Sequence, residues 1–447
     1  MDFVFLSTQG WTEMGGVGRP IHFFARELLA RGHSVLFVEV VKSENVAPQK
    51  NLRVLSFAEL GYAETALRRA WFGLDPRIHS RETFLRALDE FETPHAERVV
   101  MYADPFVPFV EWFSWFRERG YKIVYDALDD FEAFPEIGLY FANVEAEKFL
   151  VAQSDLVLAV STTLVEKLSQ WEHRAPIHLL RQGFDAELFR AYAPKHRAPP
   201  NAAAFTLGFW GHVNAFNVDV GLVESLARAR PQWTIELIGP IDVDSDLPRV
   251  EERLRALPNV KLPGRVAHEE LPRYLERFNV ALIPFPDNAF NRARDPLKVY
   301  EYLSGYKPVV ATHLPQLANM PYVYLADSPQ EFLQAVERAA NISIDRSVID
   351  AYLKNCTWRA RVDELLVRLQ EISPLPAVPT IPAALWYRER EQSANVRHYL
   401  ARTEQLLDER TGYIHNLKSD VDAKQAHINK LQSFNLLWWL KQVFSRK

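Results

Sequence analysis

Apolar residues in the first 190 positions gather in short runs that alternate with longer amphipathic segments. The runs are rich in Val, Ile, Leu and Phe, as buried strands are, and segments such as 20–31 and 144–153 have helical periodicity. We expect strands at 3–7, 35–40, 53–57, 99–102, 123–126 and 156–161. Continuous apolar strands that alternate with helices predict a parallel sheet covered on both faces.

The same alternation begins again at residue 206, after a stretch rich in Pro and Ala at 191–204 that we interpret as a linker. The strands expected in this second part are 206–211, 234–238, 260–262, 280–284 and 308–311. The sequence therefore predicts an α/β chain with two Rossmann-like domains, 1–190 and 205–371, that face each other across a cleft.

The C-terminal part has a different pattern, with a Pro-rich spacer expected at 372–385 and a helical tail at 386–447. Apolar residues of the tail recur every seven positions, at Leu400, Leu407, Ile414, Val421 and Ile428. This period favours a coiled coil that joins copies of the chain into a homo-oligomer through 393–431. Docking of the tail on the rest of the chain, or on another protein, is the alternative.

The last segment, 434–447, is apolar, contains Trp438 and Trp439 and has flanking cations. Such a segment suits the lipid–water interface, and a hydrophobic plug at the end of a helix bundle is the alternative. Residues 386–447 contain 11 Lys and Arg against 7 Asp and Glu, whereas residues 1–385 contain 41 against 50. A basic tail on an acidic body favours an anionic partner such as a membrane surface, although a solvated helix face has the same composition.

Composition narrows the class of protein. Hydrophobic residues make up 48% of the 447 positions and charged residues 24%, as in globular proteins of more than one domain. No apolar run reaches the length of about 18 residues that spans a bilayer, and the first residues lack a basic leader. Cys356 is the single cysteine, which excludes an internal disulfide and a cysteine-built metal site. The net charge of −5 gives no sign of a nucleic-acid partner. We expect a cytoplasmic protein that attaches peripherally to the inner face of a membrane if 434–447 binds lipid.

A glycine-rich loop follows the first expected strand. Gly15, Gly16 and Gly18 allow close approach of the backbone to a ligand, and Pro20 suits the first turn of a helix whose amides can hold a phosphate. A dinucleotide-binding fingerprint is the rival, but Ile21 stands in place of its third glycine and the loop is too long. A structural turn without a ligand is the remaining alternative.

A second candidate lies on a helix that Pro296 opens and Gly305 closes. Lys298 and Glu301 are three residues apart and therefore share a face near the start of this helix. A cation and amides can hold a diphosphate, and a carboxylate can accept both hydroxyls of a ribose. A surface ion pair worth under about 1 kcal/mol is the structural alternative.

Several motifs carry a resemblance to a known family. They are the segments 259–265, 270–272, 280–285 and 296–303, with weaker matches at 208–214, 15–28 and 125–131. Together they resemble the GT-B glycosyltransferases, in particular the GT4-like group of the glycosyltransferase family 1/4 type. The resemblance covers roughly residues 1–370 and is most specific between 265 and 312.

The resemblance implies a role for each donor-side residue. Glu301 would hold the ribose of a nucleoside-diphosphate sugar and Lys298 its diphosphate, while the backbone at Arg265 and Val266 would meet the base. The loop around Gly16 would close over the phosphates or the sugar. Gly211 and His212 match the loop after the first strand of the second domain, from which His212 could reach the phosphates. No metal and no cofactor are implied.

One position departs from the family pattern. The group usually has a second glutamate eight positions before the one that binds ribose, where it touches the donor sugar, and here that position is Ala293. Arg292 and Arg294 flank it. Asn291, Arg292 and Asp295 are the candidates to replace the glutamate. The identity of the sugar and the stereochemical course therefore do not follow from the resemblance.

Three residues of the first domain are candidates for catalysis on the acceptor. Asp129 and Asp130 follow the strand at 123–126, so either could orient or deprotonate an acceptor hydroxyl, or cap the next helix instead. His22 lies on the first helix, where a buried structural role is the alternative.

The resemblance implies a hexosyltransferase-like enzyme without a metal. It would move a sugar from a nucleoside-diphosphate sugar to a glycan or polyprenyl-linked acceptor, a reaction of cell-surface polysaccharide synthesis. A nucleotide-sugar epimerase of the same architecture and a non-catalytic glycosyltransferase-like scaffold are the alternatives.

Overall fold

The computed structural model describes residues 1–12, 20–60, 81–137, 143–190, 205–241 and 247–376. The chain divides into two compact units, Met1–Tyr387 and Arg388–Lys447, and all the described residues belong to the first. The expected coiled coil at 393–431 and the segment 434–447 lie outside the described residues, as do Gly15, Gly16 and Gly18.

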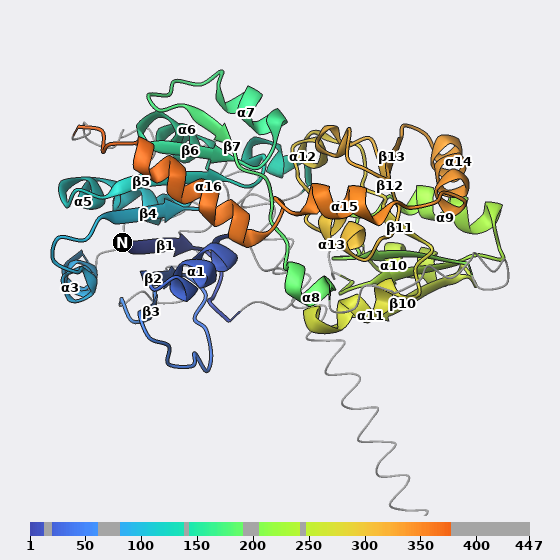
Figure 1. The fold of residues 1–447 in the computed structure, drawn as a ribbon, viewed down its shortest axis with the longest axis horizontal. Helices are drawn as coiled ribbons and strands as arrows, with labels where there is room; N and C mark the ends of the chain where they lie inside the picture. Colours follow the sequence, from blue (N-terminus) through green and yellow to red (C-terminus); the bar gives the residue numbers. More distant parts are fainter. Residues whose placement is uncertain (13–19, 61–80, 138–142, 191–204, 242–246, 377–447) are drawn as a thin grey trace, which may run out of the picture. The chain divides into compact units, whose positions relative to one another are not determined.

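The first sheet of the described chain has seven parallel strands in the order β3-β2-β1-β4-β5-β6-β7 (Figure 1). Its strands are β1 (Asp2–Ser7), β2 (Ser34–Glu39), β3 (Leu52–Ser56), β4 (Arg98–Tyr102), β5 (Lys122–Ala127), β6 (Leu156–Ala159) and β7 (Ile177–Leu179). The strand order reverses between β1 and β4. In sheets of this kind ligands bind beyond the carboxyl ends of the strands at such a reversal, so the loop after β1 is a natural site.

Helices cover both faces of this sheet. They are α1 (Pro20–Ala30), α3 (Arg81–Phe91), α4 (Val107–Glu111), α5 (Phe113–Glu118), α6 (Val144–Gln153) and α7 (Thr162–Leu168), with the 3-10 helix η1 (Phe131–Ile137) after β5. Val4 and Leu6 belong to one hydrophobic cluster, and Phe3 and Phe5 belong to another. Alternate side chains of β1 therefore serve opposite faces, as the apolar run predicts for a strand buried on both sides.

The second sheet has six parallel strands in the order β10-β9-β8-β11-β12-β13. The strands are β8 (Thr206–Trp210), β9 (Thr234–Ile238), β10 (Val260–Gly264), β11 (Val280–Ile283), β12 (Val309–Thr312) and β13 (Val323–Ala326). Its helices are α9 (Val220–Ala229), α10 (Leu247–Arg255), α11 (Leu271–Leu275), α12 (Ala289–Arg292), α13 (Lys298–Ser304), α14 (Pro329–Ala340) and α15 (Arg346–Leu353), with η3 (His268–Glu270) and η4 (Pro315–Leu317). The order reverses between β8 and β11, which makes the loop after β8 the equivalent site.

Two segments link the halves. Helix α8 (Ala186–Arg190) precedes the expected linker, and α16 (Trp358–Glu371) returns from the second half to the first. Helix α16 lies against α1 (Figure 1). Trp358 stacks on Phe23 of α1 with ring centroids 4.6 Å apart, and Val362 and Leu365 belong to the core of the first sheet. Helix α16 falls within the expected second domain, 205–371, and packs against α1 and the core of the first sheet. The domain boundaries stay predictions.

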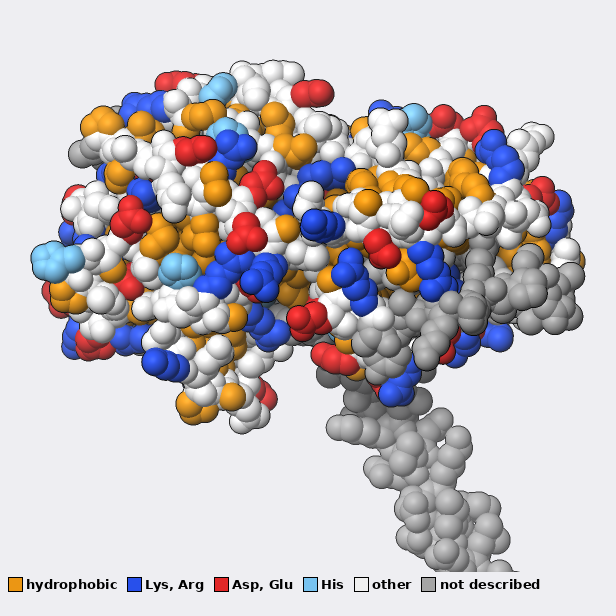
Figure 2. Space-filling model, viewed as in Figure 1, with side chains coloured by type: hydrophobic (Ala, Val, Ile, Leu, Met, Phe, Trp, Pro, Cys, Tyr) orange, Lys and Arg blue, Asp and Glu red, His pale blue; other side chains and the backbone are white. Residues whose placement is uncertain are grey.

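All the expected strands are present within one or two residues of their expected ends. The two parallel sheets confirm the predicted α/β architecture. Two short strands, β7 and β13, were not expected from the sequence; they have three and four residues, and most of their side chains are half-buried. On the face shown in Figure 2, basic and acidic side chains are interspersed rather than gathered into a field of one sign.

Candidate functional site

A cavity of about 320 Å³ lies at the carboxyl ends of the strands, and both halves of the unit line it. Gln9, Pro20, Phe23, Leu128, Asp129 and Gln182 line it from the first half. Trp210, Gly211, His212, Asn217, His268, Leu271 and the run of Arg294–Lys298 with Glu301 line it from the second. The loops after β1, β5 and β8 meet here, as the two strand-order reversals predict.

The Glu301 carboxylate lies at one end of this lining and is 4% exposed. The indole Nε1 of Trp210 donates to its Oε2 at 2.8 Å, and the His268 ring Nε2 lies 3.2 Å from its Oε1. Burial works against the charged form of His268, but the hydrogen bond and charge of Glu301 raise the pKa of that ring. Each carboxylate oxygen keeps a further lone pair, so Glu301 can still accept from two hydroxyls.

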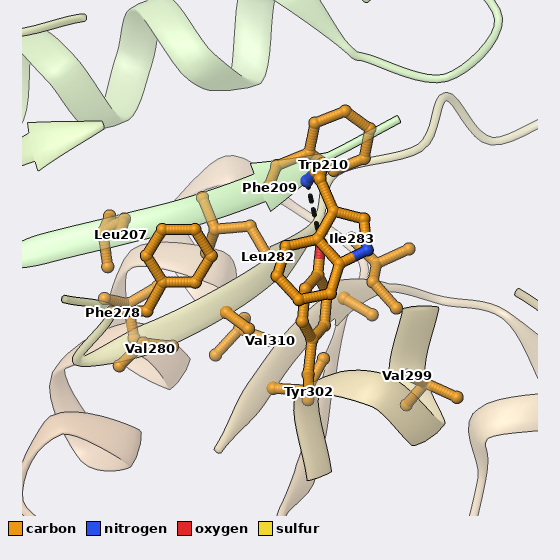
Figure 3. Close-up of a cluster of buried hydrophobic side chains, with 14 of the residues drawn as sticks. Leu207, Phe209, Trp210, Phe278, Val280, Leu282, Ile283, Val299, Tyr302 and Val310 are labelled. Carbon is orange, nitrogen blue, oxygen red and sulfur yellow. Dashed lines mark hydrogen bonds between the residues drawn. The ribbon is translucent and has the colours of Figure 1, made fainter. Parts of the chain in front are cut away.

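Packing fixes the Trp210 donor. Its backbone N–H donates to the Tyr302 hydroxyl at 2.9 Å, drawn as a dashed line in Figure 3, and the two rings are 4.3 Å apart. Phe189 also stacks on the indole and contacts the His268 ring edge-on. The surroundings of Glu301 are therefore rigid before any ligand enters.

Lys298 begins α13 one turn before Glu301, and its side chain is half-buried. Its ammonium lies 4.7 Å from the ring centre of Phe285 and 5.1 Å from that of Phe209. A Cβ at Gly211 would approach the Nζ to 3.3 Å, so the absence of a side chain at 211 keeps this corner open. Burial and the nearby Arg294 charge lower the pKa of Lys298 to about 7, against the opposing effect of Glu301.

The residues around Ala293 have separate roles. Ala293 is fully buried and belongs to the hydrophobic cluster of the first sheet, so its side chain is packed rather than exposed to the cavity. Asn291 is also fully buried and donates to the carbonyls of Phe216 and Pro286. Arg292 is exposed and pairs with Asp287 at 2.5 and 2.6 Å.

Asp295 lines the cavity, but its carboxylate is already bonded within the protein. It accepts from Arg181 Nη2 at 2.7 Å, from the Gln182 backbone N–H at 2.9 Å and from the Tyr300 hydroxyl at 2.8 Å. Of the three candidates to replace the missing glutamate, Asn291 and Asp295 are held in structural contacts and Arg292 does not line the cavity. Arg294 does line it, although the sequence analysis noted it only as a flanking residue.

The three acceptor-side candidates are separated by the geometry. Asp129 lines the cavity, whereas Asp130 pairs with Lys167 at 2.5 Å and accepts from the Ala133 backbone N–H. His22 is 1% exposed, and its Nε2 lies 3.0 Å from the Gly10 carbonyl oxygen. Neither Asp130 nor His22 is among the lining residues, and both side chains have contacts within the protein. Their catalytic roles stay predictions.

The remaining donor-side predictions also divide. Gly211 and His212 line the cavity. Arg265 is exposed and Val266 packs against the core of the second sheet, between β10 and η3, and neither is among the lining residues. Gly15, Gly16 and Gly18 lie outside the described residues. The roles of all seven residues stay predictions.

Sequence reasoning missed Trp210, His268 and Arg294 as lining residues. Trp210 and His268 meet Glu301 from positions 91 and 33 residues away, so no local spacing could indicate them. In the described part of the chain, no group of three or more His, Cys, Asp or Glu could hold a metal ion, and metal-independent chemistry stays a prediction. Nor does any described helix have the length and apolarity needed to cross a membrane.

Comparisons with known proteins concern both sequence and fold. Residues 204–341 match the family described as Glycosyl transferases group 1. The chain is 31% identical over 202 residues to TuaH of Bacillus subtilis, a putative teichuronic acid biosynthesis glycosyltransferase. The match covers 43% of this chain and 50% of TuaH, so the chain spans about half the length of this curated relative.

The fold is similar to that of several solved structures. Sucrose-phosphate synthase of Thermosynechococcus elongatus aligns with a TM-score of 0.64 at 16% identity, over 83% of this chain and 98% of that one. HepE of Anabaena, solved with UDP and glucose, aligns with a TM-score of 0.58 at 17% identity, over 83% and 99%. These likenesses show that the described chain has the two-domain GT-B fold.

Proposed function

We propose that the chain is a glycosyltransferase that moves a sugar from a nucleoside-diphosphate sugar to a glycan or lipid-linked acceptor in cell-surface polysaccharide synthesis. The observation that carries the proposal is the shared position of Lys298 and Glu301 in one cavity with Asp129 of the other half. The match of residues 204–341 to group 1 glycosyl transferases and the likeness to TuaH, a putative teichuronic acid biosynthesis glycosyltransferase, support the same class.

In this proposal Glu301 accepts the ribose hydroxyls, and Trp210 and His268 hold the carboxylate in place for them. Lys298 contacts the diphosphate beside Gly211, where no side chain obstructs the approach. The presence of UDP in the HepE crystal supports a nucleotide donor for a chain of this fold. We extend the proposal to the base, which would meet the backbone at Arg265 and Val266.

The chemistry requires stabilisation of the charge that develops on the departing diphosphate. Lys298 supplies a positive charge in a partly enclosed site, where electrostatic stabilisation is stronger than in water. We therefore propose a hexosyl transfer that needs no metal. Asp129 is the acceptor-orienting group that we favour over Asp130 and His22, because it alone of the three lines the cavity. Enclosure between the two halves would also keep water from the donor.

The proposal also includes roles for the C-terminal tail. We propose that the tail, 386–447, joins copies of the chain through 393–431 and brings the enzyme to the inner face of a membrane through 434–447. The net positive charge of the tail on an otherwise acidic chain supports an anionic surface as its partner.

A binding experiment tests the proposal. UDP, GDP and ADP are added to the full chain, and the thermal unfolding midpoint is followed, since a ligand of the native state raises it. We expect at least one nucleotide to stabilise the protein and Glu301→Ala to abolish that shift. Glu276→Ala, which removes an exposed carboxylate, serves as the matched control and should keep it.

Turnover with donor alone separates the remaining classes of function. Slow release of free sugar from a nucleotide sugar is expected of a glycosyltransferase without its acceptor. An epimerised nucleotide sugar as the product would replace the proposal by an epimerase, and the absence of both nucleotide binding and turnover would leave a scaffold.

A further inference from the structure

Two cations of the cavity share one aromatic ring. The Arg294 guanidinium lies 4.9 Å from the centre of Phe285, and the Lys298 ammonium lies 4.7 Å from the same centre. Phe290 holds the guanidinium from a second side at 5.0 Å. Two like charges on one ring repel each other, and each is attracted only weakly by the ring itself.

Amides rather than carboxylates position the guanidinium. Arg294 Nη1 donates to Asn217 Oδ1 at 2.8 Å and to Asn291 Oδ1 at 3.2 Å. Asn291 is itself anchored on two backbone carbonyls. Within the described ranges, neither Arg294 nor Lys298 forms a salt bridge. The pair is thus held in place by neutral groups, and its charge is not balanced by direct contact.

Most of the other titratable side chains around Arg294 and Lys298 are already bonded to other residues. On α13, Glu301 attracts Lys298 but is already bonded to Trp210 and to His268 of η3. Asp295 is bonded to Arg181. From the first half, Asp129 acts on Arg294, and His212 lines the cavity from the loop after β8.

Burial and the Arg294 charge together explain why the pKa of Lys298 falls to about 7. Near neutral pH, only part of the molecules therefore carry a charge on the Lys298 amine. An entering dianion would attract that charge and favour the protonated form.

We propose that Arg294 is a second binding residue for the donor diphosphate, and that entry of the diphosphate completes the charge of Lys298 by uptake of one proton from solvent. The inference rests on the proposed function and deepens it. The proton moves from water or buffer to the Lys298 Nζ, so that two positive charges face the two negative charges of the diphosphate. Donor binding then weakens up to tenfold per pH unit above pH 7, and release of the nucleoside diphosphate product speeds up.

Isothermal titration calorimetry measures the number of protons that the complex takes up when the nucleotide binds. UDP, or whichever of UDP, GDP and ADP binds, is titrated into the full chain at pH 8 in Hepes and in Tris, whose ionisation enthalpies differ. The difference in apparent binding enthalpy gives the number of protons taken up. We expect about 0.9 at pH 8, because a group with a pKa near 7 is mostly neutral at that pH. The terminal phosphate, with a pKa near 6, is already ionised at pH 8.

Two variants separate binding from a structural role. Lys298→Arg keeps the charge but cannot titrate, so uptake at pH 8 should vanish. Arg294→Gln should weaken UDP binding roughly tenfold and also reduce the uptake, because Lys298 loses its repelling neighbour. A purely structural Arg294 would affect affinity without affecting the proton count. Arg292→Gln, at the exposed pair with Asp287, is the matched control and should change neither quantity.

Each contrary result has a distinct meaning. Uptake that persists in Lys298→Arg would place the proton on His268 or His212 and overturn the inference. Equal UDP affinity and equal uptake in Arg294→Gln would overturn it as well, and so would wild-type binding without uptake. If the folded wild-type chain binds none of the three nucleotides, the proposed function fails, and that outcome is separate from the others.

Discussion

The two walls of the cavity are built in different ways. On the wall from the second sheet, Trp210 and His268 hold Glu301 in place before a ligand enters, and Lys298 lies beside two aromatic rings. The wall from the first sheet offers one carboxylate, Asp129, beside apolar and amide groups. A rigid, charged wall suits a donor of constant chemistry, and a sparse wall leaves room for the acceptor to decide specificity.

We expect the largest effect on stability from a substitution in the contact between the two walls. Asp295 of the second wall accepts from Arg181 and Gln182 of the first half, and its side chain is fully buried. Asp295→Ala leaves the guanidinium without its partner, and we expect a loss of about 3 kcal/mol in the free energy of unfolding. Denaturant unfolding measures it.

Asp295→Asn, which keeps the size and one acceptor, should cost clearly less than the alanine variant. Equal stability of Asp295→Ala and wild type would mean that the walls are joined by the apolar packing of α16 and α1 instead.

The next prediction separates the two neighbouring acids of the first wall. Asp129→Asn should lower kcat/KM about 100-fold if Asp129 orients or deprotonates the acceptor, while UDP affinity changes less than about threefold. Asp130→Asn is the matched control, because Asp130 pairs with Lys167 away from the cavity and its loss should affect mainly stability. Steady-state kinetics with a working acceptor decide between them, and the reverse ranking would exchange the roles of the two residues.

The first half of the unit also contains a buried acid that does not line the cavity. Glu147 of α6 is 2% exposed and accepts from the Tyr125 hydroxyl of β5 at 2.8 Å. Burial raises the pKa of Glu147 to about 8 from a model-compound value of 4.5, so the native state binds the proton more tightly than the unfolded chain. Its stabilising effect is complete below pH 4.5 and is lost as the pH rises through about 8.

A pH series tests this contribution. Between pH 5 and pH 8, the free energy of unfolding should fall by up to about 1.4 kcal/mol per pH unit from this one group. Glu147→Gln keeps the acceptor but not the proton, so its stability curve should be flatter and should exceed the wild-type curve toward pH 8. Parallel curves for the two proteins would show that Glu147 is ionised in the native state.

The sequence was most informative where function depends on local spacing. Lys298 and Glu301 could be placed together because residues three apart on a helix share a face, and most of the strands could be found because they are short and rich in apolar residues. Asp129 and Asp130 could not be told apart, since both follow β5 and no local spacing shows which of two adjacent side chains faces the cavity. The contact of α16 with α1 and the position of Arg294 in the lining of the cavity depend on packing between segments that are distant in the sequence. No local pattern encodes such packing.

The smallest effect that we predict concerns the precision of the second wall. Trp210→Phe keeps a ring between Phe189 and Tyr302 but removes the Nε1–H that donates to Glu301 at 2.8 Å. A lost hydrogen bond to a charged group of this kind costs about 1 kcal/mol here, because His268 still holds the other carboxylate oxygen. UDP affinity should therefore fall about fivefold, measured by calorimetry, with the unfolding midpoint nearly unchanged. If affinity is unaltered, the carboxylate does not need to be oriented in advance, and the contrast between a preorganised wall and a sparse one loses its physical basis.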